Sequence, residues 1–114
     1  MAGEYGPPQL DVGAAAAMLE QPGVRLLDVR EDVEWAAGHA PSAEHCPLAK
    51  VEPAPYRDAT AVVVVCRSGR RSQRAAVALH DAGVTAYNLT GGMQAWAQAG
   101  RRVVCDDGTP GLVA

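Results

Sequence analysis

The part of this chain best suited to chemistry is a short segment that begins with Cys66. The cysteine is followed by three arginines, two serines and a glycine: Arg67, Ser68, Gly69, Arg70, Arg71 and Ser72. A cysteine reacts as its thiolate, and neighbouring cations lower the pKa of the thiol and so favour that anion. The whole chain has a formal net charge of −3, so the arginines form a local positive site that suits an anionic ligand. The segment predicts a nucleophilic cysteine in an anion-binding loop.

The residues around this segment predict a strand before it and a helix after it. Residues 61–65 are an uninterrupted apolar run, which is typical of a buried strand. Residues 72–82 carry apolar side chains at helical spacing, and Gly83 suits the position just after a helix end. Backbone N–H groups and the positive end of the helix dipole meet in such a loop, where they stabilise an anion. Gly69 lets the loop backbone curl around the sulfur.

The other predicted elements alternate between helices and strands along a single domain. Helices are predicted at residues 12–20, with Asp11 as the N-cap, at 31–37 and at 92–98, and strands at 24–29, 43–46, 85–89 and 102–105. This alternation implies an α/β fold with a parallel sheet of about five strands flanked by helices. A length of 114 residues fits one domain, residues 1–114, of which residues 1–8 form an irregular leader.

Composition argues against several classes of function. The chain has a single lysine, Lys50, and a negative net charge, so it lacks the basic surface that general nucleic-acid binding needs. No apolar segment approaches the ~20 residues needed to cross a bilayer, and no signal-peptide pattern opens the chain, so we expect a soluble, cytoplasmic protein. Cys46, Cys66 and Cys105 lack the close spacing of a zinc site. We therefore expect reduced thiols and no metal, nucleic-acid or membrane partner.

Three motifs follow one another along nearly the whole chain. They are Leu27-Asp28-Val29-Arg30-Glu31 with Glu34-Trp35 and Gly38-His39-Ala40-Pro41, then the segment from Cys66 to Ser72, then Gly91-Gly92-Met93 with Trp96. Together they resemble the motifs of the rhodanese-like (sulfurtransferase) family. The departures are modest, because Ala40 and Ser42 replace a usual isoleucine and glycine, and Cys46 replaces an aliphatic residue. The resemblance implies a three-layer fold with the central parallel sheet between layers of helices.

The resemblance implies a sulfurtransferase in which Cys66 is the catalytic residue. Cys66 would take a sulfane sulfur from a small anionic donor such as thiosulfate, hold it as a persulfide, and pass it to cyanide, a thiol or a protein. This double displacement requires no metal or organic cofactor. The rest of the loop, residues 67–72, would bind the anionic substrate. Asp28 and Arg30 are expected to form a supporting ion pair, and His39 a structural hydrogen bond.

Three alternatives stay open on the sequence. A cysteine phosphatase or arsenate reductase of the related fold carries an arginine after five intervening residues, where this chain has Ser72, while Arg71 comes one position earlier. That spacing favours sulfur transfer. A sulfur-relay or protein-binding module with little turnover of small molecules is the second alternative, and the presence of Cys66 with a full loop favours an enzyme. A purely structural, buried Cys66 is the third, and the adjacent glycine and arginines argue against it.

The remaining candidates are expected to have structural roles. Trp35 and Trp96 are predicted to be core residues, and His45, which belongs to no motif, is predicted to lie on the surface. Arg74 is as consistent with a solvated helix face as with ligand contact. Cys105 is expected to pack as a small apolar residue, although it is also a candidate resolving thiol that would attack the persulfide.

Overall fold

The computed structural model describes residues 6–114 and centres on a parallel sheet. Within these residues the five strands are β1 (Gln9–Leu10), β2 (Val24–Asp28), β3 (Glu44–His45), β4 (Ala61–Val65) and β5 (Ala86–Leu89). They lie in the order β1-β5-β4-β2-β3, and each neighbouring pair is parallel. The two shortest strands, β1 and β3, therefore form the edges, and β4 lies at the centre.

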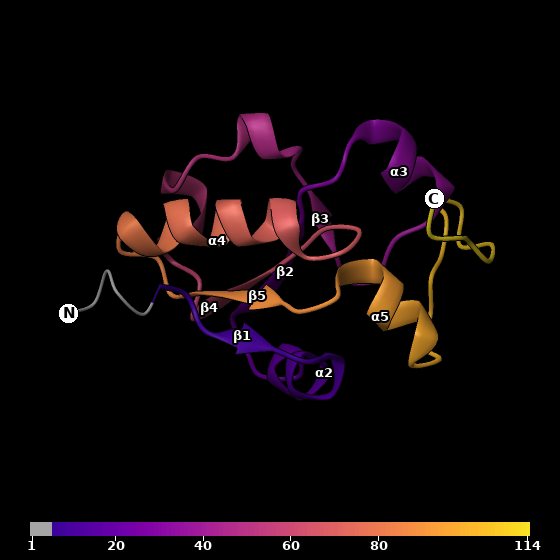
Figure 1. Cartoon of the computed structure of the whole chain (residues 1–114), viewed down its shortest axis with the longest axis horizontal. Helices are drawn as coiled ribbons and strands as arrows, with labels where there is room; N and C mark the ends of the chain where they lie inside the picture. Colours follow the sequence, from indigo (N-terminus) through magenta and orange to yellow (C-terminus); the bar gives the residue numbers. More distant parts are fainter. Residues whose placement is uncertain (1–5) are drawn as a thin grey trace.

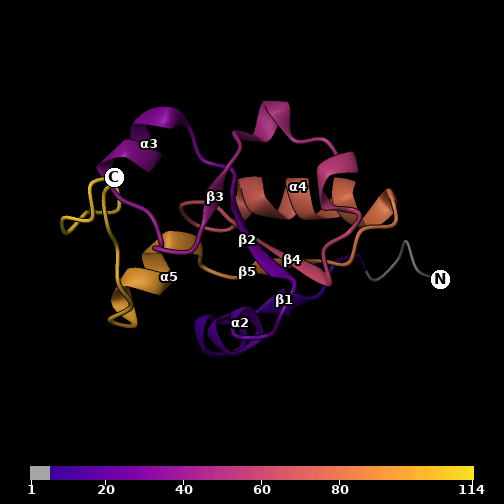
Figure 2. The same cartoon turned by 180° about the vertical axis from the view of Figure 1, so that it is seen from behind.

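Helices cover both faces of the sheet. They are α2 (Val12–Leu19), α3 (Asp32–Ala37), α4 (Arg70–Asp81) and α5 (Gly92–Gln98), and two short 3-10 turns are η1 (Leu48–Lys50) and η2 (Ala54–Tyr56). In both Figure 1 and Figure 2, α4 lies on one side of the sheet and α2 on the other. This is the three-layer α/β arrangement that the resemblance implies.

Each face of the sheet has its own hydrophobic core, and β4 contributes to both. Val62 and Val64 pack with Leu79 of α4, whereas Val63 and Val65 pack on the side of α2 and α5. Successive side chains of a strand point to opposite faces, so a strand that is covered on both faces is apolar at every position. The two cores hold the carboxyl end of β4 in place, and the cysteine follows directly from it.

Most helices and strands lie where the sequence predicts them. Asp11 caps α2, because its Oδ1 accepts a hydrogen bond from the Ala14 N–H at 2.8 Å. Helix α4 begins at Arg70, two positions before the predicted start at residue 72, because Gly69 is its N-cap with a left-handed φ of 109°. Arg70 and Arg71 therefore belong to the first turn of this helix.

The strand predicted at residues 102–105 is wrong. Of these residues, Val104 makes isolated antiparallel bridges with His39 and Pro110, and the segment does not join the sheet. The position beside β5 is instead occupied by β1. Val103 packs instead against the hydrophobic core on the side of α2 and α5.

Within residues 6–114, the chain has neither a membrane-spanning helix nor a metal-binding cluster. No helix of this part is long and apolar enough to cross a bilayer. The same residues hold no group of three or more His, Cys, Asp or Glu side chains placed to bind a metal ion. Of the predicted leader, residues 6–8 belong to no helix or strand, and residues 1–5 lie outside the described residues.

Candidate active site

Cys66 lies where β4 ends, at the edge of the sheet from which the chain turns into α4. The parallel register brings neighbouring strand ends to the same edge, since Asp28 of β2 pairs with Val65 and Asn88 of β5 pairs with Val64. Cys66 is therefore flanked by the ends of β2 and β5. Only 1% of the residue is exposed, which keeps its thiol out of bulk water.

Hydrogen-bond donors converge on the Cys66 sulfur. The Gly69 N–H donates to Sγ at 3.1 Å, and the Ser72 hydroxyl lies 3.3 Å from Sγ. Burial raises the pKa of the Cys66 thiol, but hydrogen bonds from the Ser72 hydroxyl and from the N–H groups of Ser72, Gly69 and Ser68 outweigh burial and lower that pKa below its usual value. The loop thus stabilises the thiolate.

The first turn of α5 holds the outer side of the loop. The N–H groups of Met93 and Gln94 donate to the carbonyls of Cys66 and Arg67 at 2.8 and 3.0 Å. A Cβ atom at Gly92 would lie 2.6 Å from the Arg67 carbonyl oxygen, so this close approach requires glycine. The loop carbonyls point toward α5, which leaves the loop N–H groups for the sulfur. This contact explains why the third sequence motif has a glycine at position 92.

Helix α3 holds Arg71 at the side of the loop. Nη1 and Nη2 of Arg71 donate to the two carboxylate oxygens of Glu34 at 2.6 and 2.9 Å. The hydrogen bonds from Arg71 lower the pKa of Glu34 to about 2, and those to Glu34 raise the pKa of Arg71. The sequence places Arg71 among the anion-binding residues without indicating this partner. The positive charge of Arg71 is therefore already balanced by Glu34 before any anion enters the loop.

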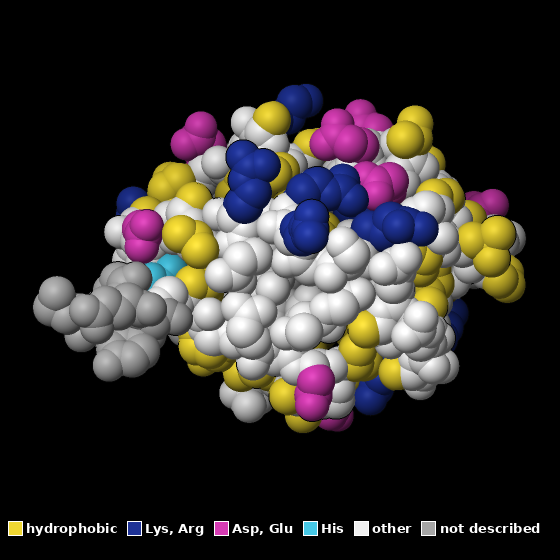
Figure 3. Space-filling view, in the orientation of Figure 1, with side chains coloured by type: hydrophobic (Ala, Val, Ile, Leu, Met, Phe, Trp, Pro, Cys, Tyr) yellow, Lys and Arg dark blue, Asp and Glu magenta, His cyan; other side chains and the backbone are white. Residues whose placement is uncertain are grey.

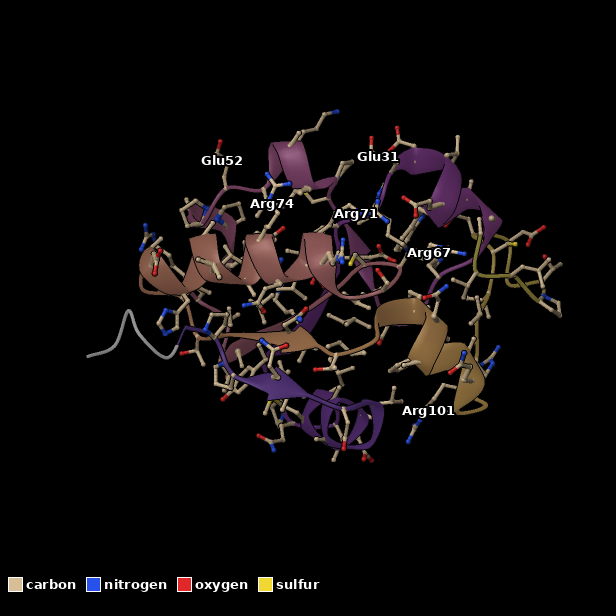
Figure 4. The ribbon with its side chains drawn as sticks, viewed as in Figure 1. Glu31, Glu52, Arg67, Arg71, Arg74 and Arg101 are labelled. Carbon is tan, nitrogen blue, oxygen red and sulfur yellow. The ribbon has the colours of Figure 1, made fainter. Side chains whose placement is uncertain are left out.

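The other arginines of the loop and of the start of α4 lie on the surface around the loop. Arg67 donates from Nε to the Ala114 carbonyl at 2.8 Å. Arg70 and Arg74 are exposed, and neither has an ion pair within the described part of the chain. Figure 4 shows Arg74, Arg71 and Arg67 one after another along α4 and the loop, and Figure 3 shows dark blue side chains gathered there. Arg67, Arg70 and Arg74 are the cationic rim of the site.

The ion pair expected between Asp28 and Arg30 is present and fully buried. Nη2 of Arg30 donates to Asp28 Oδ2 at 2.8 Å and to the Gly38 carbonyl at 2.7 Å. Beside it, His39 Nδ1 donates to the Trp35 carbonyl at 2.9 Å. These contacts tie the end of β2 to α3 and the residues that follow it. They support the wall of the site beside the cysteine.

Trp35 and His45 do not lie where the sequence predicts them. Trp35 is half-buried and outside the core, and its ring stacks on the rings of His39 and His45 with centroid distances of 3.5 and 4.8 Å. His45 is half-buried rather than on the surface, because its Nε2 donates to the Arg30 carbonyl at 2.8 Å. Stacking between separate segments leaves no periodic pattern in the sequence. Trp96, by contrast, is buried as predicted.

Two polar residues near the cysteine were not predicted from the sequence. Asn88 of β5 has its Oδ1 2.6 Å from Ser72 Oγ, and Gln9 of β1 accepts a hydrogen bond from Asn88 Nδ2 at 2.8 Å. Asn88 is 4% exposed although it belongs to a strand. The one sequence signal for Asn88 is that a polar residue interrupts the apolar pattern of a strand. A buried amide needs hydrogen-bond partners, so such a residue indicates a polar neighbour nearby.

A cavity of about 450 Å³ opens beside Arg71. It lies between α4 and the segment that contains η1, and its lining is partly apolar and partly charged: Leu48, Val51, Ala75, Ala78, Glu31 and Arg74. Arg71 directly precedes Ser72, whose hydroxyl lies near the sulfur, so the cavity adjoins the loop. The site combines a buried cysteine sulfur with a space large enough for a small organic molecule.

Comparisons with known proteins agree with the fold and the motifs. The family model described as rhodanese-like domain matches residues 11–99. Thiosulfate sulfurtransferase GlpE of Vibrio cholerae is 35% identical over 95 residues, which cover 79% of this chain and 88% of that protein. The uncharacterized protein slr1261 of Synechocystis is 36% identical over 94 residues, which cover 80% of this chain. The chain spans about half the length of that second relative, 52%.

A solved structure shares the fold. The crystal structure of a thiosulfate sulfurtransferase from Pseudomonas aeruginosa matches with a TM-score of 0.76 at 25% identity, covering 97% of this chain and 23% of that chain. The matched residues 11–99 contain all three sequence motifs, and the parallel sheet positions the second and third motifs against each other. The chain therefore belongs to the rhodanese-like domain family, whose members include sulfurtransferases.

Proposed function

We propose that this protein is a sulfurtransferase that moves a sulfane sulfur from a donor such as thiosulfate to a thiophilic acceptor through a persulfide on Cys66. The observation that carries the proposal is a buried sulfur that faces the Gly69 N–H at 3.1 Å and the Ser72 hydroxyl at 3.3 Å. Such donors stabilise the thiolate, which is the attacking form of cysteine. A relative named thiosulfate sulfurtransferase, GlpE of Vibrio cholerae, supports the same class of reaction.

The reaction is a double displacement on Cys66. The thiolate attacks the outer sulfur of thiosulfate, a new S–S bond forms, and the S–S bond of the donor breaks. Sulfite leaves with the bonding electron pair. The acceptor then attacks the outer sulfur of the persulfide, and the Cys66 thiolate leaves. The Gly69 N–H stabilises the negative charge on Sγ before the first step and after the second.

The cavity beside Arg71 suits an acceptor that is a small organic thiol with a carboxylate. Its apolar lining, from residues such as Leu48 and Ala78, can pack against the body of the thiol. Arg74 lines the same cavity and has no ion pair among residues 6–114, so it is available to the carboxylate. Cyanide is too small to need these contacts. The two acceptor classes therefore differ in how much they depend on the cavity.

A phosphatase reaction has less support. Ser72 stands where a phosphatase loop of this type carries its arginine, and Ser72 is buried near Sγ. Arg71 is bound through both terminal nitrogens to Glu34. A phosphate in the loop would lack an arginine placed to bind its oxygens. A relay module would use the same persulfide as the enzyme, so transfer rates with free acceptors distinguish those two functions.

The proposal is tested by the intact mass of the reduced protein after incubation with thiosulfate. We expect the gain of one sulfur atom, and we expect a reductant to remove it. Cys66→Ser should gain none, because serine cannot form the persulfide. Cys105→Ser, a matched variant at another free cysteine, should gain sulfur and turn over like the unaltered protein. Sulfur gain by Cys66→Ser, or no gain by the unaltered protein at any thiosulfate concentration, would contradict the proposal.

A further inference from the structure

A buried line of uncharged polar side chains leads from the Cys66 sulfur to the edge strand β1. Ser72 Oγ lies 3.3 Å from Sγ and 2.6 Å from Asn88 Oδ1. Asn88 Nδ2 donates to Gln9 Oε1 at 2.8 Å and to the Gly69 carbonyl at 3.2 Å. Ser72 and Asn88 are 0% and 4% exposed, so bulk water does not compete for these hydrogen bonds. The double displacement described above makes no use of Asn88.

These contacts determine which way the Asn88 amide points. The Gly69 carbonyl is a backbone acceptor and cannot reverse its role, so the part of Asn88 that faces it must be the NH2 group. Gln9 is held in a similar way, because its Nε2 donates to the Pro7 carbonyl at 3.3 Å and its Oε1 then faces Asn88. The amide oxygen of Asn88 therefore faces Ser72, where it can only accept a hydrogen bond.

Ser72 has one hydroxyl proton and two groups that compete for it. Asn88 Oδ1 is the first acceptor, and the Cys66 sulfur becomes the second when it is a thiolate. While Cys66 is a thiol, the Ser72 hydroxyl donates its hydrogen bond to Asn88 Oδ1, and the S–H group can donate to the serine oxygen. When the thiolate forms, the hydroxyl turns toward Sγ. Loss of the hydrogen bond to Asn88 opposes thiolate formation, and gain of the charge-assisted one favours it.

We propose that Asn88 is a positioning residue that tunes the reactivity of Cys66 by competing with the thiolate for the Ser72 hydroxyl proton. This inference rests on the proposed function, in which Sγ alternates between a thiolate and an uncharged sulfur bonded to the transferred atom. The negative charge of a persulfide lies on its outer sulfur. The hydroxyl therefore turns to Asn88 when sulfur is loaded and back to Sγ when the acceptor removes it. The rotation breaks no covalent bond and transfers no proton.

The charged groups near the cysteine lie on other sides of the site. They are on α3, on the loop and first turn of α4, and at the end of β2: Glu34, Arg67, Arg70, Arg71, Asp28 and Arg30. Of these, Arg71 interacts electrostatically with Cys66. Toward β5 and β1 the cysteine meets uncharged side chains. Uncharged substitutions at Ser72 and Asn88 therefore change hydrogen bonds and leave the surrounding charges in place.

The test is the pKa of the Cys66 thiol, measured from the pH dependence of its alkylation by iodoacetamide, with the Cys66 peptide quantified by mass spectrometry. Ser72→Ala removes the side-chain donor to the thiolate, so we expect the pKa to rise by about 1. Asn88→Leu removes the competing acceptor, so we expect the pKa to fall. Asn88→Asp adds a stronger acceptor and a negative charge, so we expect the pKa to rise.

A double variant separates an effect through Ser72 from a general structural effect. Asn88→Leu should leave the thiol pKa unchanged when residue 72 is already alanine, because no hydroxyl remains to compete for. Gln9→Ala is the matched control, since Gln9 is exposed and contacts the NH2 side of Asn88, and it should leave the pKa unchanged. A rise of the pKa in Asn88→Leu, or an equal fall with and without the Ser72 hydroxyl, overturns the proposal. Asn88→Val, which suits a strand, replaces the leucine variant where leucine prevents folding.

The alkylation measurement needs neither a sulfur donor nor an acceptor. If the protein fails to load sulfur but Ser72→Ala and Asn88→Leu shift the thiol pKa in opposite directions, sulfur transfer is contradicted and the role of Asn88 is upheld. If sulfur loads on Cys66 but Asn88→Leu leaves the pKa unchanged, the role of Asn88 alone is overturned. The two failures are therefore distinguishable.

Discussion

The pKa of the Cys66 thiol depends on hydrogen-bond donors more than on the arginines around it. The contacts of Sγ are the Gly69 N–H and the Ser72 hydroxyl, whereas both terminal nitrogens of Arg71 are bound to Glu34. A charge-assisted hydrogen bond acts at short range and fixed geometry. Exposed arginines act through solvent, where salt screens charges beyond roughly 10 Å. The hydrogen bonds of the folded loop therefore lower the pKa of the thiol. The cationic rim instead attracts anions that approach the loop.

Glu34 makes the stability of the fold depend on pH. Arg71 lowers the pKa of Glu34 from 4.5 to about 2 in the folded chain, and unfolding returns that pKa to its ordinary value. The unfolded state then binds the proton more readily, so the stabilisation is fully present above pH 4.5 and is lost as the pH falls toward 2. We expect on the order of 2 kcal/mol of unfolding free energy to be lost over this range, as measured by urea unfolding at each pH.

Two glutamine variants isolate this contribution. Glu34→Gln keeps the size of the side chain and removes its charge, so its unfolding free energy should change less over this pH range than that of the unaltered protein. Glu52→Gln, at an exposed glutamate (Figure 4), should keep the full pH dependence. The same pH dependence in Glu34→Gln as in the unaltered protein would mean that the ion pair adds no pH-dependent stability.

At the residue scale, the sequence predicts single residues and close pairs better than distant pairs. The place of Cys66 between a strand and a helix is predicted because the whole pattern lies within one short segment. The ion pair of Asp28 and Arg30 is predicted because the two residues are two positions apart. The partner of Arg71 is 37 positions away, and the partner of Ser72 is 16 positions away. Such contacts arise when the sheet brings separate strand and helix ends together, and no local pattern encodes them.

At the scale of the elements, two helices outside the strand-loop-helix unit shape the cysteine loop. Helix α5 binds the carbonyls of Cys66 and Arg67 through the N–H groups of its first turn. Helix α3 binds the first turn of α4 through Glu34 and Arg71. Both contacts act on backbone or side chains beside the sulfur and not on the sulfur itself. The loop therefore needs the docked α3 and α5 to keep its N–H groups directed at Sγ.

Gly92 is the residue at which this docking is most sensitive to substitution. Its φ is 58°, and a Cβ there would lie 2.6 Å from the Arg67 carbonyl oxygen. Gly92→Ala should lower the free energy of unfolding by about 1–3 kcal/mol, through backbone strain and steric overlap. It should also raise the pKa of the Cys66 thiol, because the loop must move away from α5. Urea unfolding and the pH dependence of alkylation measure the two effects.

Gly100 offers a control with the same backbone strain and no overlap. Its φ is 77°, and no atom lies within 4 Å of the position that a Cβ would take. Gly100→Ala should therefore destabilise the fold less than Gly92→Ala and leave the pKa of Cys66 unchanged. Equal losses of stability in the two variants would mean that the contact between α5 and the loop is not tightly packed at Gly92.

The sequence predicts long elements well because each carries its own pattern. Strand β4 is apolar at every position, and α4 has apolar residues at helical spacing. Strand β1 has two residues, too few for any pattern. Val103 and Val104 form an apolar pair that resembles a short strand, yet β1 occupies the place beside β5. Which segment fills the edge of a sheet is decided by competition between segments, and the sequence of one segment does not contain that information.

At the scale of the whole molecule, the charge distribution differs sharply from the net charge. The chain carries a formal charge of −3, but the face around the loop displays the cationic rim of Arg67, Arg70 and Arg74 (Figure 3). A local field of one sign raises the concentration of an oppositely charged ligand near a site. This face therefore favours the approach of an anionic ligand, such as the sulfur donor of the proposed reaction.

In the proposed reaction, the cavity beside the loop is where the acceptor binds. It lies between α4 and the segment with η1, and Ala75 and Ala78 of α4 line it. A cavity of about 450 Å³ is large enough for a small organic thiol, whereas cyanide does not need to fill it. If the acceptor enters here, closing the cavity should slow transfer to a bulky thiol and spare transfer to cyanide.

Ala78→Trp fills the cavity from α4 without changing any residue that contacts the sulfur. With thiosulfate as donor, we expect a several-fold loss of kcat/KM for glutathione as acceptor and little change for cyanide, because persulfide formation precedes acceptor binding. Val77→Trp is the matched control, since Val77 is an exposed neighbour on α4 that does not line the cavity, and it should alter neither rate. Equal slowing of both acceptors by Ala78→Trp would mean that the tryptophan disturbs the loop, and unchanged rates with both would mean that thiols reach the persulfide by another route.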